Sequence, residues 1–344
     1  MQKSPQASTV LPVLMGVASL IIIVAGLKAM ADLLSPILLS LFIVLVSNPI
    51  MVWLHRRGLP KWLAYTLVVV GVMIIGFIFL LFFAVSVAQL TRALPTYQAL
   101  IDARIAGFQT WLTQYDLQLE DVFQLQWFNP DNIFNTLLAF VAALLGAMSD
   151  VGLTLLIFIY MLASAAGFAL RLNQGLAHDL PSLQRCRDFA SSTSTYLLIK
   201  SWLGAIVALL QVILMWILGV DFAILWGVLS FLFNFVPNIG FYLAMIPPVV
   251  ITLIKFGVGK TIILIVGYTV INNLFDIVVA PRYLGEGLDL STLVAFLAVV
   301  FWAWVLGPIG AFMALPLTVM VKKLVLESFD DTQLLAKLMS SGTE

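Results

Sequence analysis

Charged side chains are scarce in this sequence. Only 10% of the residues are Asp, Glu, Lys or Arg, whereas 62% are hydrophobic. An ordinary soluble domain has about a quarter of its residues charged. The 17 basic and 17 acidic residues cancel, so the overall charge favours neither nucleic acid nor an acidic partner. We therefore expect no nucleic-acid partner and a lipid bilayer as the main solvent.

Cysteine and histidine are also rare. Cys186 is the single cysteine in the sequence, which excludes an intramolecular disulfide framework and a site with several cysteine ligands. His55 and His178 are the two histidines. Both fall in predicted polar loops, so neither a zinc site nor a Ser–His pair is available within the membrane. We expect no catalytic residues, no metal and no cofactor, and therefore no enzyme.

Long apolar runs are what the sequence has in abundance. Residues 62–91, 222–254 and 290–321 contain no charged side chain. Each run exceeds the roughly 18 to 20 apolar residues that cross a bilayer. The pattern predicts an all-α polytopic membrane protein. Apolar segments are expected at 10–31, 33–54, 62–88, 151–170, 202–220, 222–236, 239–254, 261–280, 291–306 and 308–321.

Two stretches between the apolar segments are more polar. In residues 89–149 and 171–200, apolar side chains recur three and four apart between charges, which is typical of amphipathic helices beside a membrane. Lys and Arg near helix ends are retained in the cytoplasm, and the loop 55–61 is the clearest basic loop. If that loop is cytoplasmic, 89–149 lies outside and 171–200 inside. Both termini are then cytoplasmic.

A weak internal repeat marks the last third of the chain. "NIGFYLAMIPP", starting at Asn238, resembles "PIGAFMALPLT", starting at Pro308, because both share Ile-Gly, three residues and an alanine. Each copy lies between short apolar arms, so we predict two hairpins that turn at 237–240 and 307–310. The expected topology gives them opposite orientations, as in secondary transporters whose site lies near the membrane midplane. Alternatively, they are plain connections between tilted helices.

The predicted fold therefore has about five full transmembrane helices and two inverted hairpins of short helices, or about eight or nine crossings if the hairpins span the membrane. The parts are N-terminal transmembrane helices (1–88), an extracytoplasmic amphipathic segment (89–149), a transmembrane helix (150–170), a cytoplasmic amphipathic segment (171–200), a C-terminal membrane domain with two related hairpins (201–322) and a cytoplasmic tail (323–344).

Polar side chains interrupt the apolar segment 261–280. The spacing of Asn272, Asn273 and Asp276 puts amides and a carboxylate on one helical face. An aspartate at the bilayer centre costs about 2.5–3.5 kcal/mol, and such residues tend to line a pathway or meet a partner. One interpretation is a binding site. The other is an interfacial Asp276 that Arg282 neutralises.

We predict a substrate-binding site built from these side chains and the two hairpin turns. Asparagines near the turns could instead cap the broken helix ends. The candidate site residues are Asn234, Pro237, Asn238, Gly240, Asn272, Asn273, Asp276, Arg282, Gly307, Pro308 and Gly310.

Two stretches carry a resemblance to a known family. "WGVLSFLFNFVPNIGFYLAMIPP" at 226–248 and "PRYLGEGLDLSTLVAFLAVVFWAWVLGPIGAFMALPLTVMVK" at 281–322 resemble the autoinducer-2 exporter (AI-2E) family. The similarity covers nearly the whole chain, including "LPTYQALI" at 94–101. The resemblance implies a multi-spanning carrier of the bacterial inner membrane, and it is strongest to the member implicated in export of the quorum-sensing signal autoinducer-2. Members elsewhere in the family resemble sodium/proton antiporters, and family members often have a glutamate where this chain has Ala280.

Three functions stay open at this point. The first is secondary transport or facilitated export of a small polar signal molecule such as autoinducer-2. The second is monovalent cation (sodium)/proton antiport, and the third is a membrane scaffold that transports nothing. The expected partners are a small polar molecule or a cation, the lipid bilayer, and further copies of the chain if it forms a homo-oligomer.

Overall fold

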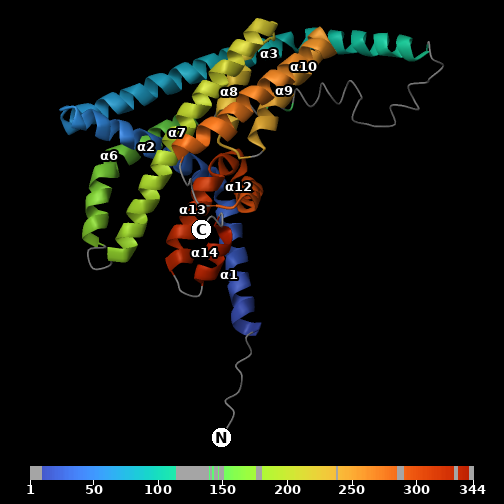
Figure 1. The fold of residues 1–344 in the computed structure, drawn as a ribbon. Coiled ribbons are helices and arrows are strands. Elements are labelled where there is room, and N and C mark those ends of the chain that lie inside the picture. Colours follow the sequence, from blue (N-terminus) through green and yellow to red (C-terminus); the bar gives the residue numbers. More distant parts are fainter. Residues whose placement is uncertain are drawn as a thin grey trace.

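All regular elements that the structure describes are helices (Figure 1). The computed structural model describes residues 10–113, 151–175, 180–237, 239–284, 290–328 and 332–340, with three isolated positions between 114 and 150. Within this part of the chain, five helices are long and apolar enough to cross a membrane, and shorter apolar helices accompany them. The predicted all-α polytopic fold is confirmed.

Three helices form the N-terminal part. They are α1 (Val10–Ala29), α2 (Ala31–Arg56) and α3 (Lys61–Thr113). With 53 residues, α3 is about 80 Å long at 1.5 Å per residue, well beyond the roughly 30 Å hydrocarbon core of a bilayer. The polar stretch predicted from residue 89 therefore starts within one continuous helix. A change from apolar to polar side chains leaves the backbone hydrogen bonds intact, so it does not end a helix. The rest of the predicted segment 89–149 lies almost wholly outside the described residues.

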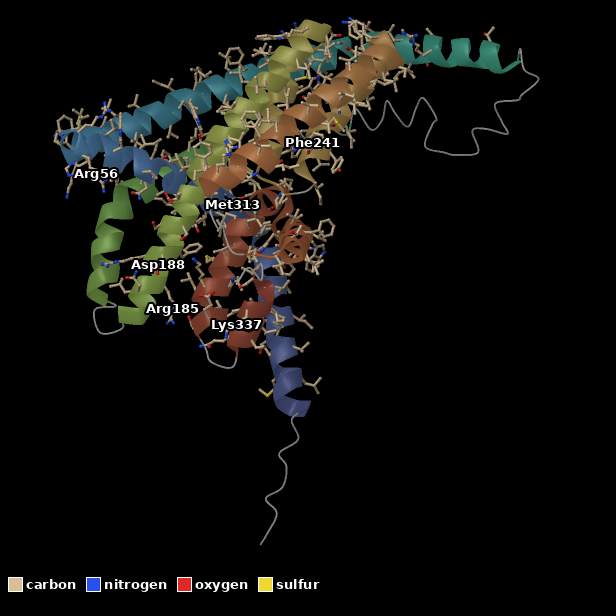
Figure 2. All side chains as sticks on the ribbon, in the orientation of Figure 1. Arg56, Arg185, Asp188, Phe241, Met313 and Lys337 are labelled. Carbon is tan, nitrogen blue, oxygen red and sulfur yellow. The ribbon has the colours of Figure 1, made fainter. Side chains whose placement is uncertain are left out.

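The helices α6 (Val151–Gly175) and α7 (Leu180–Leu218) follow. The second polar stretch, 171–200, likewise forms no separate helix, because its described residues continue α6 and begin α7. Arg185 and Asp188 lie on the lower part of α7, far below Phe241 (Figure 2). The upper part of α7 packs against α8 and α10, while α2 packs against both α6 and α7. Helix α7 therefore contacts both the N-terminal and the C-terminal parts.

The first predicted hairpin is present. Its arms are α8 (Ala223–Phe233) and α9 (Gly240–Phe256). They pack against each other and against α3, and the chain between them turns without regular structure. The following α10 (Val258–Asn273) runs directly into a π-helical segment, η2 (Leu274–Val279), and then into α11 (Ala280–Leu284).

The second hairpin is formed by α12 (Thr292–Phe312) and α13 (Ala314–Leu324): the part of α12 before Gly307 is its first arm, and the rest of α12 with α13 is its returning arm. Although α12 is one of the five long apolar helices, Gly307 breaks it with φ +69° and ψ −152°. A side chain would make this backbone conformation unfavourable, so glycine is needed there. The helical run is thus divided near the predicted turn. A short 3₁₀ segment, η3 (Leu326–Ser328), and α14 (Gln333–Met339) complete the chain.

The two hairpins meet at their turns. Phe235, just after α8, and Phe312, at the end of α12, have ring centroids 4.5 Å apart. Phe42 of α2 contacts both rings, at 5.2 and 4.7 Å. Such tilted and edge-to-face ring pairs add attraction beyond the area they bury. We call Phe42, Phe235 and Phe312 the aromatic triad.

The repeated Ile-Gly has the same structural role in both hairpins. A Cβ atom added to Gly240 would lie 1.9 Å from the carbonyl oxygen of Phe233. One added to Gly310 would lie 2.0 Å from the carbonyl oxygen of Trp302. In each case the glycine lets the returning arm start directly against the backbone of the preceding arm. The repeat in the sequence therefore corresponds to a repeated close backbone contact.

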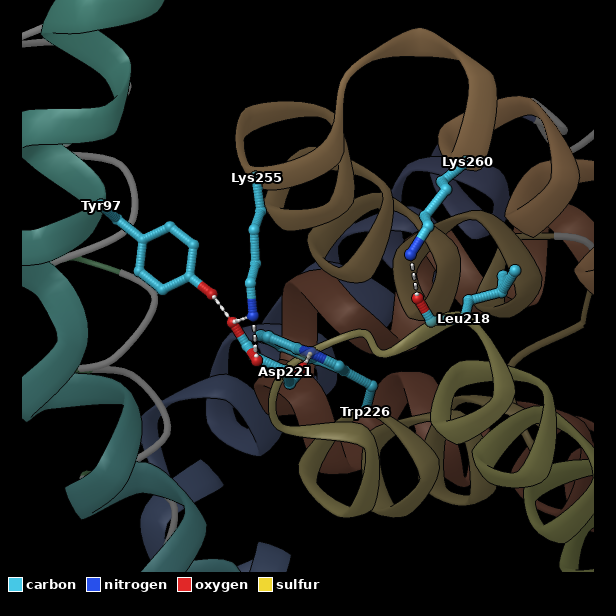
Figure 3. Close-up of polar contacts among 6 residues, drawn as sticks. All are labelled: Tyr97, Leu218, Asp221, Trp226, Lys255 and Lys260. Atoms are coloured by element: carbon cyan, nitrogen blue, oxygen red, sulfur yellow. Dashed lines mark hydrogen bonds and ion pairs between the residues drawn. The ribbon is translucent and has the colours of Figure 1, made fainter.

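A cluster of polar groups closes the open end of the first hairpin (Figure 3). Asp221 lies before α8 and Lys255 near the end of α9, and the Lys255 Nζ is 2.6 and 2.7 Å from the two carboxylate oxygens of Asp221. The Tyr97 hydroxyl of α3 donates to Asp221 Oδ2 at 2.6 Å. The Trp226 Nε1 donates to the Asp221 carbonyl at 2.9 Å. We call Tyr97, Asp221 and Lys255 the first clamp.

A different segment closes the open end of the second hairpin. The Ser291 amide, at the start of α12, donates to the Met339 carbonyl at 2.9 Å. The Lys322 Nζ, near the end of α13, donates to Ser340 Oγ at 2.7 Å. Both bonds are made to the C-terminal segment. We call Ser291, Lys322, Met339 and Ser340 the second clamp. Since the hairpins meet at their turns, and α14 lies on the opposite side from α3 (Figure 1), the two open ends face opposite ways.

Candidate functional site

A cavity of about 420 Å³ lies where the turn of the first hairpin meets α7 and α10. Its wall combines the broken end of α8, the start of α9, and polar side chains from the two long helices. A volume of this size is within the range of small-molecule sites. The lining residues are Lys200, Val207, Ser230, Phe233, Asn234, Val236, Pro237, Gly240, Phe241, Tyr242, Ala244, Thr269, Asn272, Asn273 and Asp276.

The wall from α10 carries the polar face that the spacing predicts. Asn272 and Asp276 lie on one side of the helix, and the Asn272 Nδ2 donates to Asp276 Oδ2 at 2.8 Å. Asn273 lines the same cavity. Asp276 lies within the π-helical segment η2. Such segments interrupt the regular hydrogen bonding of α-helices and occur often at functional sites.

The charge partner of Asp276 comes from another helix than expected. Its Oδ1 lies 3.5 Å from the Nζ of Lys200, on α7. Arg282, the partner considered from the sequence, lies exposed on α11 and does not line the cavity. The local sequence around Asp276 contains no signal for this pair, because Lys200 lies more than 70 residues earlier in the chain. Only the packing of α7 against α10 brings the two groups together.

Asn234 connects the hairpin turn to the same lysine. Its Nδ2 donates to the Lys200 carbonyl at 3.3 Å, so the side chain reaches across to α7, while its backbone N–H ends α8 by donating to the Ser230 carbonyl. A Cβ atom on Gly204 would lie 2.5 Å from this Nδ2. The glycine one turn after Lys200 therefore makes the space that Asn234 occupies.

A second polar link between α7 and α8 lies close by. The Ser230 hydroxyl, in the cavity wall, donates to Gln211 Oε1, and both side chains are buried. Ser230 and Thr269 were not among the candidates, and a lone hydroxyl in an apolar helix gives no signal that distinguishes it from an ordinary packing residue. Of the predicted residues, the structure brings six into the cavity wall: Asn234, Pro237, Gly240, Asn272, Asn273 and Asp276.

The predicted residues of the second hairpin lie outside this wall. Gly307, Pro308 and Gly310 belong to the second turn, and their chain neighbours Leu306 and Ile309 lie in the apolar cluster that also holds Phe235 of the first turn. Asn238 lies outside the described residues. Of the two hairpins, the first alone contributes described residues to the cavity wall.

The chemistry that the wall offers is hydrogen bonding. Amide groups of three asparagines supply donors and acceptors, hydroxyls supply both, and the broken helix presents backbone groups. The part of the chain that the structure describes holds no group of three or more His, Cys, Asp or Glu side chains suited to a metal ion. Membrane carriers likewise have a polar site beside an interrupted helix within an apolar fold.

Comparison with known proteins gives a consistent result. The family model described as "AI-2E family transporter" matches residues 17–330. The AI-2 transport protein TqsA of Escherichia coli (strain K12) is 31% identical over 321 residues, which cover 93% of each chain. A putative transport protein of Haemophilus influenzae is 34% identical over 334 residues, 95% of each chain. The putative transport protein YhhT of Escherichia coli (strain K12) is 31% identical over 346 residues.

The family match extends over the N-terminal helices, both hairpins and the residues that line the cavity. They confirm the resemblance stated from the sequence and identify a membrane transporter. The chain belongs to the AI-2E family of transporters.

Proposed function

We propose that this protein exports a small, polar, uncharged molecule such as autoinducer-2 from the bacterial cytoplasm, and that the cavity at the first hairpin binds it. The proposal rests on the polar cavity. This cavity lies at the turn between α8 and α9 and is surrounded by apolar helices. The relative TqsA is described as an AI-2 transport protein, which supports the same substrate class. Transport would be passive or coupled to a gradient.

The lining suits a neutral hydroxylated solute. Asparagine side chains can both donate to and accept from hydroxyl groups. The hydroxyls of Ser230 and Thr269 donate to Gln211 and to the Ile265 carbonyl, so they can accept from the solute. Apolar side chains such as Phe233 and Phe241 complete the wall and would cover the carbon skeleton of the solute. Efflux and uptake of autoinducer-2 by the purified protein in liposomes test the proposal directly. Flux no faster than in protein-free liposomes would reject it.

Sodium/proton antiport is the alternative function, and flux measurements in the same liposomes distinguish it from export of a neutral molecule. Antiport requires a carboxylate that exchanges a proton for a cation, and Asp276 is the carboxylate in the cavity wall. We expect Asp276→Asn to keep measurable flux of autoinducer-2 that does not change with pH. The loss of one charged contact, worth about 1.5–3 kcal/mol, should weaken affinity without stopping turnover. Initial rates across a range of substrate concentrations and pH values measure both effects.

Asp102→Asn is the matched control, because Asp102 is an exposed carboxylate on α3 away from the cavity. It should leave the flux unchanged. If Asp276→Asn abolishes sodium-driven proton movement that the unaltered protein performs, the antiporter is the correct function and the export proposal is wrong.

The proposed location is the bacterial inner membrane with both termini in the cytoplasm. The basic loop at 55–61 implies that the far end of α3 lies outside and Cys186 inside. Cysteine in place of Thr110, an exposed residue near the end of α3, should react with a membrane-impermeant thiol reagent added to whole cells. Cys186 should react only after the cells are permeabilised. The reverse labelling pattern would invert the topology.

A further inference from the structure

We propose that Lys200 determines specificity by balancing the charge of Asp276, so that the cavity accepts neutral hydroxylated solutes and rejects ions of either sign. The inference rests on the proposed function, because it assigns substrate binding to this cavity. Lys200 is not among the site residues that the sequence predicts. It is the single lysine or arginine among the described lining residues, and Asp276 the single carboxylate.

The pair is loose and accessible. Its atoms are 3.5 Å apart, and the side chains of Lys200 and Asp276 are 18% and 45% exposed. A direct charged hydrogen bond between such groups is normally about 2.7–2.9 Å long. The cavity therefore presents a strong donor beside a strong acceptor. Neighbouring hydroxyl groups of one solute would match them, one accepting from the ammonium group and one donating to the carboxylate.

Both ends of this arrangement are held by other elements. Asp276 Oδ2 accepts from Asn272, and the backbone carbonyl of Lys200 accepts from Asn234 of the hairpin turn. The Asp276 carboxylate is thus oriented by Asn272, and the backbone of Lys200 is fixed beside the first hairpin, before a solute arrives. Groups that are oriented in advance lose little freedom on binding, which favours a specific complex.

The low polarity of the surroundings explains why the balance of the two charges would determine which solutes bind. A single uncompensated charge in a partly buried site produces a strong local field, because the protein and lipid screen it far less than water does. With both charges present, a bound cation meets the ammonium group and a bound anion meets the carboxylate. Removal of either charge should therefore admit ions of the sign opposite to the charge that remains.

The test uses the full-length protein in nanodiscs of uncharged lipid, with three probes of similar size. Erythritol is neutral, erythronate is an anion and choline is a cation. Isothermal titration measures their affinities for the unaltered protein, Lys200→Gln, Asp276→Asn and the double variant. We expect the unaltered protein to prefer erythritol by about tenfold or more over both ions, a difference of about 1.4 kcal/mol.

Lys200→Gln should gain affinity for choline by about tenfold, and Asp276→Asn should gain affinity for erythronate by a similar factor. The double variant should regain the preference for erythritol, because its site is neutral again. Lys260→Gln is the control, since Lys260 is exposed and its Nζ bonds the Leu218 carbonyl outside the cavity. It should keep the order of affinities of the unaltered protein.

The inference is wrong if both single variants keep the original order of affinities. It is also wrong if the affinities for all three probes fall equally, which is the result expected for a purely structural ion pair. The double variant protects the test against poor folding of either single variant. If the ion preferences change as expected but autoinducer-2 is not transported, the proposed function fails and the charge balance stands. If autoinducer-2 is transported and the preferences do not change, only the role of Lys200 fails.

Discussion

Replacing Gly240 or Gly310 with alanine is expected to destabilise the folded protein strongly. The added Cβ would lie 1.9 Å from the carbonyl oxygen of Phe233 or 2.0 Å from that of Trp302. Both neighbours are backbone atoms, so the clash cannot be relieved by rotating a side chain. Overpacking in protein interiors costs about 1–3 kcal/mol and occasionally more, and we expect the upper end here. The melting temperature in a mild detergent should fall by several degrees for each variant.

Gly71→Ala is the matched control. Gly71 lies within α3, and a Cβ added there meets no atom within 4 Å. Because alanine also has the higher helix propensity, this variant should melt at the same temperature as the unaltered protein or slightly above it. Equal melting of all three alanine variants would show that the two hairpin turns are not the close backbone contacts described.

Phe235→Ala is expected to separate the two hairpin turns. The Phe235 ring is 4% exposed and contacts Phe42, Phe231 and Phe312 with centroid distances of 5.2, 5.7 and 4.5 Å. Truncation of a buried phenylalanine to alanine costs about 3–5 kcal/mol. Since the neighbouring Asn234 and Val236 line the cavity, transport should fall as well. Unfolding by a denaturing detergent and flux in liposomes measure the two effects.

Two further variants are compared with Phe235→Ala. Phe235→Leu keeps most of the buried volume and should lose less stability. Phe77→Ala removes a ring that is 67% exposed on α3 and should change neither stability nor transport. If Phe77→Ala is as harmful as Phe235→Ala, the loss reflects contact with lipid and not the junction between the turns.

Local patterns predicted the parts of this protein that depend on local geometry. Asn272 and Asp276 are four residues apart, and helical geometry alone places them on one face, where they form a hydrogen bond. The repeated Ile-Gly identified both hairpin turns, because a turn between packed arms needs glycine for backbone contact. The apolar run lengths located α2, α3, α7 and α10, which are four of the five described helices long and apolar enough to cross a membrane.

Features that depend on packing between distant segments could not be predicted in this way. Lys200 reaches Asp276 only because α7 crosses α10, and no spacing along the chain encodes that crossing. The lengths of α3 and α7 were also missed. The expected helix ends followed the change from apolar to polar side chains, whereas real ends depend on backbone breaks such as Gly307. The π-helical segment at Asp276 has no distinct residue signature.

The two clamps differ in when they become complete during synthesis. Tyr97, Asp221 and Lys255 have all been made once the ribosome passes residue 255, so the first hairpin can close while the rest of the chain is still being translated. Ser291 and Lys322 must wait for Met339 and Ser340. Chains fold in this direction as they emerge. The first hairpin can therefore assemble first, whereas the open end of the second hairpin closes only after α14 has been made.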